Sequence, residues 1–193
     1  MHGLAHMANR KREVRQGSVA VVHRFCRRVG AAAPHGFHRK SQSGDSSRLA
    51  AEATRLASAL PTSGAERFVG LPFTVTSLWR FRAGPGVEGV VANLVRHVNE
   101  EARPLEERTL VIAERDSTRR DERFTLSYYD RSQGAEETVV SRDVLAIARA
   151  TPDAQPMLVI GRDYGDGMAY AIVQRDPSGR WREKWRSPRR HCS

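Results

Sequence analysis

Apolar residues repeat with a helical period in two parts of the chain. The first part, residues 46–60, carries its large and small apolar side chains on one stripe: Leu49, Ala53, Leu56 and Leu60. Ser46 or Ser47 can cap the first turn, and Pro61 follows the last apolar position. This pattern predicts a short amphipathic helix.

The second helical pattern follows a glycine-proline-glycine breaker at residues 84–86 and ends before Pro104. Its apolar side chains recur at spacings of three and four: Val87, Val90, Val91, Leu94 and Val98. The spacing predicts the main helix of the fold, buried along this stripe. Leu94→Ala is therefore expected to cost about 2–5 kcal/mol, and Asn93→Ala on the opposite face well under about 1 kcal/mol.

Other stretches show the pattern of strands. The first of them, residues 68–82, alternates and places five side chains on one core face: Phe73, Val75, Ser77, Trp79 and Phe81. The remaining strands follow the second helical pattern, at residues 109–114, 124–130 and 137–145, with three more within residues 157–186. Their short connections require antiparallel neighbours, because a parallel crossover needs a dozen or more residues.

The clearest local signal is the turn at residues 176–179, which reads Asp-Pro-Ser-Gly. Proline supplies the fixed φ that a type I turn requires at its second position, and Gly179 can adopt a positive φ at the end of the turn. Alternating residues flank the turn on both sides. The turn therefore predicts a β-hairpin, and we favour a register in which Gly179 forms a bulge.

The register of this hairpin decides how its aromatic side chains pack. With the bulge, Trp181 lies opposite Arg175 and Trp185 opposite Ala171; without it, Trp185 lies opposite Tyr170. In both registers the two tryptophans share one face of the last strand and its basic residues share the other, because side chains alternate along a strand.

A helix with an apolar stripe and an antiparallel meander bury each other most simply when the sheet curves around the helix. We therefore expect an α+β fold in which one main helix packs on a curved antiparallel sheet of about six to seven strands. Over residues 68–187 this order of elements resembles the cystatin-like roll and, more loosely, the cone-shaped folds related to nuclear transport factor 2. The Gln-x-Val-x-Gly loop of cystatins is absent, so the resemblance does not imply protease inhibition.

Charge is distributed unevenly along the chain. Residues 1–44 carry a net charge of +8 and residues 180–193 a net charge of +5, whereas residues 45–179 carry −3, out of +10 for the whole chain. Pattern and charge together predict four parts: a basic tail (1–44), a short helix with a linker (45–67), a single α+β domain (68–187) and a basic C-terminal tail (188–193).

Residues 1–44 suit three interpretations. Their composition is typical of a disordered tail, or of a segment added by a translation start set too far upstream. An arginine-rich, nearly acid-free composition also suits a mitochondrial presequence, and the charge suits an arm that binds nucleic acid. No apolar run in residues 1–44 is long enough for a membrane span or a signal-peptide core, so we expect a cytoplasmic protein, or a mitochondrial one if the segment is a presequence.

Two groups of side chains are candidate binding sites. Five aromatic residues could line the concave face of a curved sheet and hold a ligand, or simply fill the core: Trp79, Tyr128, Tyr170, Trp181 and Trp185. A basic group near the C-terminus could bind nucleic acid, or could protect an edge strand from pairing: Arg180, Arg182, Lys184, Arg186, Arg189 and Arg190.

The sequence carries no signature of a catalytic, metal or cofactor site. Cys26 and Cys192 have no partners at zinc-site spacing, and the glycine-rich segment 163–167 lacks the oxygen ligands of a calcium loop. The expected function is that of a small non-enzymatic binding or accessory module for a small apolar ligand or a protein. One alternative is an RNA- or ribosome-associated protein that binds through its basic tails, and another is a small enzyme of the cone-shaped α+β type.

Overall fold

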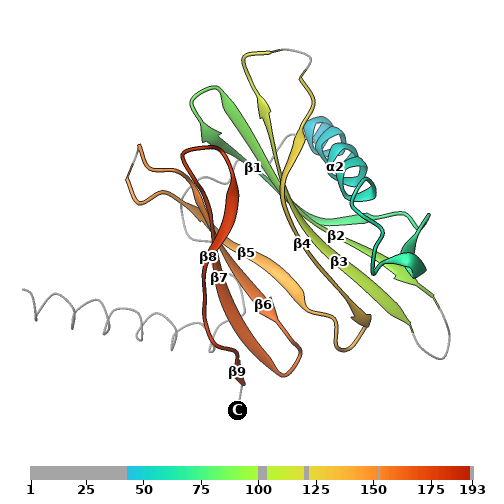
Figure 1. Ribbon diagram of the computed structural model, residues 1–193. Helices are drawn as coiled ribbons and strands as arrows, with labels where there is room; N and C mark the ends of the chain where they lie inside the picture. The colour runs from blue at the N-terminus through green and yellow to red at the C-terminus, as the bar shows by residue number, and fades with distance from the viewer. Residues whose placement is uncertain (1–42, 100–103, 120–121, 152, 192–193) are drawn as a thin grey trace, which may run out of the picture. The chain divides into compact units, whose positions relative to one another are not determined.

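Antiparallel strands make up most of the described chain. The computed structural model describes residues 43–99, 104–119, 122–151 and 153–191, all within one compact unit (Figure 1). The predictions for residues 1–42 and for Cys192 lie outside these residues. The elements are α2 (Ser43–Ser58), the short 3-10 helix η1 (Glu66–Phe68), β1 (Thr74–Gly84), β2 (Val87–Val98), β3 (Leu105–Asp116), β4 (Thr125–Ala135), β5 (Ser141–Ala148), β6 (Met157–Asp163), β7 (Gly167–Arg175), β8 (Trp181–Arg186) and β9 (Arg190–His191).

The strands form two sheets rather than one. Sheet A has the order β1-β2-β3-β4, and sheet B has the order β5-β6-β7-β8 with β9 paired to β7. All strand pairs are antiparallel, as the short connections predicted. The two sheets share a buried core to which both contribute: Phe81, Val91, Leu110 and Ile112 from sheet A, and Val144, Leu158, Ile160, Val173 and Trp181 from sheet B.

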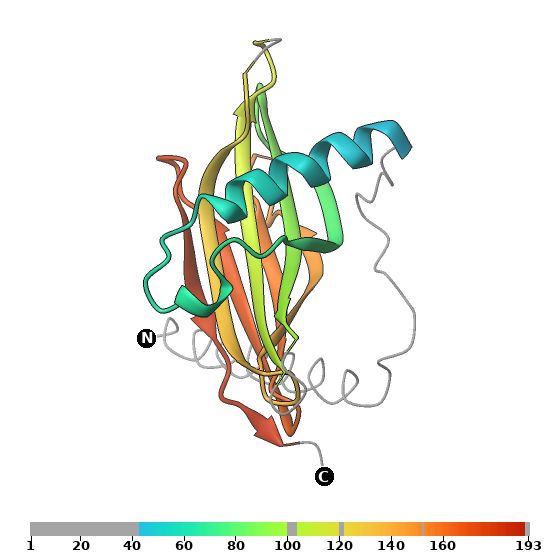
Figure 2. The same ribbon diagram turned by 90° about the vertical axis from the view of Figure 1, so that its right-hand side faces the viewer.

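Helix α2 covers the face of sheet A that points away from sheet B (Figure 2). Its apolar stripe packs in two clusters, with Ala53 beside Leu94 and with Leu49 and Leu56 beside Val90. The predicted amphipathic helix is therefore confirmed, although its bounds shift by a few residues. The α+β class is also confirmed, while the expected single curved sheet is wrong and the cystatin-like roll is not confirmed.

The predicted main helix is wrong, because residues 87–98 form strand β2. This strand is buried on both faces: Val90 and Leu94 lie beneath α2, whereas Val91 lies in the core between the sheets. A strand buried on both faces shows a continuous apolar run, and such a run also contains the three- and four-residue spacings of a helix. The β-branched valines favour the extended form.

Two other strand boundaries differ from the prediction. Strand β1 begins at Thr74, and residues 66–68 form η1 instead of continuing the strand. Strand β5 spans Ser141–Ala148, later than the predicted 137–145, because residues 136–139 form a turn after β4. Residues 59–65 connect α2 to η1, and Gly64 among them has a φ of 76°.

The hairpin at residues 176–179 forms as predicted, with the bulge. The Asp176 amide donates to the Arg180 carbonyl at 2.8 Å, and Gly179 has a φ of 85°. Trp181 lies opposite Arg175, as expected, but Trp185 lies opposite Ile172 rather than Ala171.

A second bulge explains the different position of Trp185. The register shifts between Ile172 and Val173, at the level of Lys184, and turns Trp185 to the other face of β8. Trp181 is consequently 4 % exposed and Trp185 50 % exposed. The prediction that both tryptophans share one face is therefore wrong.

Candidate functional site

The five aromatic residues predicted to hold a ligand do not line a common cavity. Trp181 lies in the core between the sheets, where its ring meets Phe81 edge to face with centroids 5.7 Å apart. Trp79 and Tyr128 pack at the border of that core, and burial raises the pKa of the Tyr128 hydroxyl.

Tyr170 and Trp185, the other two predicted aromatics, belong to the opposite face of sheet B. Tyr170 lies between Ala169 and Ala171, which are both buried beneath sheet A, so alternation places its side chain on the outer face. Ligand binding by the five aromatics stays a prediction, but these residues would have to act in two separate groups.

The basic residues near the C-terminus do not form one row either. Arg182 and Lys184 are exposed on β8, whereas Arg186 donates to Glu183 at 2.7 Å and Arg189 pairs with Asp166. The bulge at Lys184 reverses the alternation of side chains along β8, so Arg182 and Arg186 lie on different faces of the strand. Nucleic-acid binding by Arg180, Arg182, Lys184, Arg186, Arg189 and Arg190 stays a prediction.

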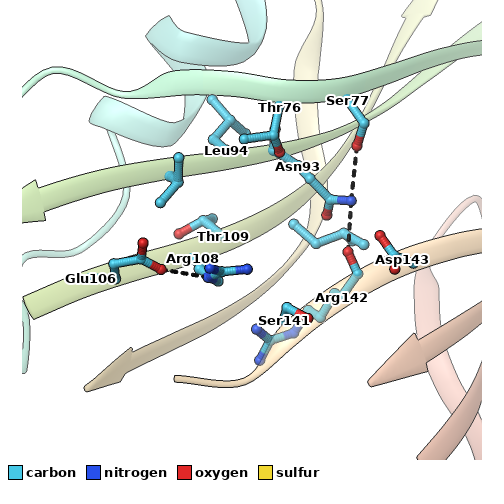
Figure 3. A pocket seen from close by; sticks show the side chains of 12 residues that line it. Thr76, Ser77, Asn93, Leu94, Glu106, Arg108, Thr109, Ser141, Arg142 and Asp143 are labelled. Atoms are coloured by element: carbon cyan, nitrogen blue, oxygen red, sulfur yellow. Dashed lines mark hydrogen bonds and ion pairs between the residues drawn. The ribbon is translucent and has the colours of Figure 1, made fainter. Parts of the chain in front are cut away.

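A cleft of about 360 Å³ opens between sheet A and the first strand of sheet B (Figure 3). None of the candidate binding residues predicted from the sequence lines it. Its lining comes from β1, β2, β3 and β5 and is mostly polar: Thr76, Ser77, Asn93, Leu94, Val95, Glu106, Arg108, Thr109, Leu110, Ser141, Arg142 and Asp143.

Asn93 joins the two sheets at the back of this cleft. Its amide nitrogen donates to Ser77 Oγ at 3.0 Å and to the Arg142 carbonyl at 2.8 Å (Figure 3). The sequence pattern placed Asn93 on the solvent side of a helix, so the expectation that Asn93→Ala is nearly silent rests on a wrong premise. In strand β2 the side chain is partly buried and bonded on both sides.

Both signs of charge are present in the cleft. Glu106 is 3 % exposed and accepts from Arg108 Nε at 2.6 Å. Its second carboxylate oxygen lies 3.2 Å from Nδ1 of His97. The side chain of Arg108 remains 37 % exposed, and Asp143 is exposed on β5. The cleft thus offers a cation and an anion to a bound molecule.

Arg142 connects the cleft to a buried network of charges between the sheets. It donates to Asp130 at 2.7 Å, and Asp130 also accepts from Arg162, which in turn donates to Glu183 at 2.8 Å. Arg162 is 2 % exposed. A buried cation of this kind is tolerated only because carboxylates surround it.

The network holds its carboxylates ionised. Burial alone would raise the pKa of Asp130, but hydrogen bonds and charge from Arg142 and Arg162 outweigh it and lower that pKa. The hydrogen bond from Arg186, together with Arg162, lowers the pKa of Glu183. Permanently charged groups position the strands and bind ions or dipoles well, but they are poor proton donors near neutral pH.

The outer face of sheet B is apolar, and no described element covers it. Seven apolar or aromatic side chains form what we call the sheet B outer face: Leu145, Met157, Val159, Met168, Tyr170, Ile172 and Trp185. They converge over Gly161, where an added Cβ would lie 3.3 Å from Leu145 Cδ1 and 3.5 Å from Met168 Cε. On sheet A, α2 packs over the corresponding face of β1, β2 and β3, and the exposed apolar side chains there are those of Leu126 and Tyr129 on β4.

Within the described residues, no group of three or more metal-ligating side chains converges, and no helix has the length and apolar character needed to cross a membrane. Comparison with known proteins finds no matching family, no similar curated protein and no similar solved structure.

Proposed function

We propose that this chain is a non-enzymatic binding module whose cleft holds a small molecule with both a positive and a negative charge, such as an α-amino acid. The observation that carries the proposal is the cleft of about 360 Å³ with Arg108 and Asp143 on its lining. This volume lies at the lower end of the range of about 300–1,000 Å³ for ligand pockets.

The two exposed charges suit the two ends of a zwitterion. The guanidinium of Arg108 keeps donors free after Nε binds Glu106, and a carboxylate is the group that guanidinium donors match best. Asp143, on the facing strand β5, can accept from an ammonium group. The apolar side chains of Val95 and Leu110 leave space for a short hydrocarbon part between the charges.

The hydroxyl groups of the cleft favour binding over catalysis. A nucleophilic hydroxyl needs a neighbouring general base. Ser77 Oγ instead accepts from Asn93, and Thr76 Oγ1 donates to the Asn93 carbonyl at 3.2 Å. His97, a possible base, faces Glu106 at 3.2 Å. These contacts support a recognition role for the lining.

The test is a titration of the full chain with the twenty common L-amino acids, with acetate and methylamine as singly charged fragments, followed by calorimetry and by NMR. At least one zwitterion is expected to bind saturably and more tightly than either fragment. Arg108→Met should weaken that binding by about tenfold or more, since a hydrogen bond to a charged group contributes about 1.5–3 kcal/mol.

Arg182→Met is the matched control, because it removes a guanidinium from exposed β8, outside the cleft lining. It should leave the affinity unchanged. Binding that Arg108→Met and Arg182→Met reduce equally, or a panel without a saturable ligand, would contradict the proposal.

A further inference from the structure

We propose that the sheet B outer face is the contact surface between two copies of this chain, related by a two-fold axis that runs parallel to strands β6 and β7. This inference does not depend on the cleft ligand. In such a dimer each copy presents the same face, so β5 of one copy lies over β8 of the other, and β6 lies over β7.

Two rows of side chains across sheet B support this symmetry. The first row runs Ala146, Val159, Ile172, Trp185, from the smallest side chain on β5 to the largest on β8. A two-fold axis parallel to the strands reverses the row in the second copy. It therefore sets each Trp185 over Ala146 of the other copy and each Ile172 over Val159, large over small.

The next row along the strands again sets a large residue over a small one. Gly161 on β6 pairs with Tyr170 on β7 within one sheet. The two-fold axis sets Tyr170 of one copy over Gly161 of the other, which has no side chain of its own, so the ring would meet only the ends of Leu145 and Met168 beside it. Faces that pack well alternate large and small residues in this way, and buried aromatic residues contribute most to the stability of such contacts.

The size of the face suits a contact surface. Four strands about 4.8 Å apart, each with six to nine residues at about 3.3 Å per residue, cover roughly 15 by 25 Å. Apolar patches of about 300–600 Å² on monomers are often functional. Sheets already pack face to face inside this chain, and a second such contact would add a layer of the same kind.

Charge favours a second copy over other partners. Arg182 and Lys184 are exposed along the β8 border, and Asp163 ends β6. Under the proposed symmetry the basic β8 border lies over the β5 border of the other copy, not over itself. A nucleic acid or an anionic lipid surface would bring negative charge against Asp163 as well as against the basic border.

The test is the mass of the full chain in solution, measured by sedimentation equilibrium over a wide range of concentrations. The expected mass is twice the 21.6 kDa of one chain. Ala146→Trp would place two large rings against each other, and Trp185→Ala would remove a ring; each should weaken the dimer by about 30-fold or more. The double variant, Ala146→Trp with Trp185→Ala, exchanges the positions of the large and the small side chain and should regain most of the lost affinity.

Leu126→Trp, on an exposed position of β4, is the control for an added tryptophan and should leave the dimer intact. Circular dichroism identifies any variant that fails to fold. If a single variant does not fold, the affinity of the double variant tests the proposed contact. A chain that is monomeric at every concentration overturns the proposal. So does a dimer insensitive to Ala146→Trp, or a monomer whose Trp185 fluorescence shifts with phosphatidylglycerol vesicles, which would assign the face to a lipid surface.

Discussion

Sheets A and B differ in what lies against their outer faces. Sheet A packs against sheet B on one side and against α2 on the other, whereas sheet B packs only against sheet A within the described residues. The difference is visible in two central strands. In β2, Val90, Val91, Ala92 and Leu94 are all buried, whereas in β7 the buried residues Ala169, Ala171 and Val173 alternate with partly exposed ones.

Covering a sheet on both sides also requires that its polar side chains be paired within the protein. On the α2 side of sheet A, Glu107 is 0 % exposed and accepts from Arg96 at 3.0 Å. The guanidinium carbon of Arg96 lies 4.4 Å from the ring centre of Phe73 and 5.7 Å from that of Phe68. On the sheet B outer face the charged residues stay at the borders. The two sheets should therefore respond differently to the same kind of substitution.

The largest effect is expected where charged side chains hold the two sheets together. Asp130→Ala removes the carboxylate that Arg142 and Arg162 share and leaves two buried cations underpaired. Breaking a buried ion pair from one side costs about 3–5 kcal/mol. Urea unfolding of the variant measures this loss. Asp153→Ala, at an exposed position of the β5–β6 connection, is the control and should change stability by less than about 0.5 kcal/mol.

The next largest effect is expected beneath α2, where the loss of stability can be compared directly with that on the outer face of sheet B. Leu94 is 1 % exposed beneath α2, so Leu94→Ala should cost about 2–5 kcal/mol. Ile172 is partly exposed on the sheet B outer face, and Ile172→Ala should cost well under about 2 kcal/mol in the monomer. Both are measured by urea unfolding at low protein concentration. Equal losses would show that the sheet B outer face is covered as completely as sheet A.

The features that the sequence predicted correctly depend on neighbours along the chain. Helix α2 has a stripe on one side and a polar opposite side, and the 176–179 hairpin has its own turn residues. The prediction of a helix at β2 was wrong because burial on both faces removes the alternation of apolar and polar residues that marks a strand. The predicted position of Trp185 was wrong because the bulge at Lys184 leaves no local signal in the sequence.

The cleft could not be predicted, because it depends on how two sheets meet. Asn93, Arg108 and Asp143 lie on three different strands, and no spacing in the sequence relates them. One signal was available: an asparagine within an apolar run of a strand is expected to find hydrogen-bond partners inside the protein. That signal applies to a strand, whereas the spacing of apolar residues around Asn93 indicated a helix.

A smaller effect is expected at Asn93, whose amide joins sheet A to β5. Asn93→Ala removes hydrogen bonds to Ser77 Oγ and to the Arg142 carbonyl and leaves the carbonyl without this donor. A loss of about 1–3 kcal/mol is expected. Asn99→Ala, the same substitution at an exposed position just after β2, is the control. If the two variants unfold at the same urea concentration, Asn93 does not connect the sheets in solution.

The smallest effect is expected from mild acid. The pKa values of Asp130 and Glu183 are lowered in the folded chain, so the unfolded chain binds protons first as the pH falls. Their stabilising contribution is complete above the unfolded pKa values, about 3.9 for Asp and 4.3 for Glu, and is lost as the pH falls through the lower folded values.

The free energy of unfolding of the natural chain and of Asp130→Asn, measured from pH 7 to pH 3, isolates the part due to Asp130. The difference between them should stay constant down to about pH 5 and shrink below about pH 4, because only then does the natural carboxylate lose its charge in the unfolded chain. A difference that already shrinks between pH 7 and pH 5 would mean that Arg142 and Arg162 do not hold Asp130 ionised, and the charged connection between the two sheets would be weaker than their geometry indicates.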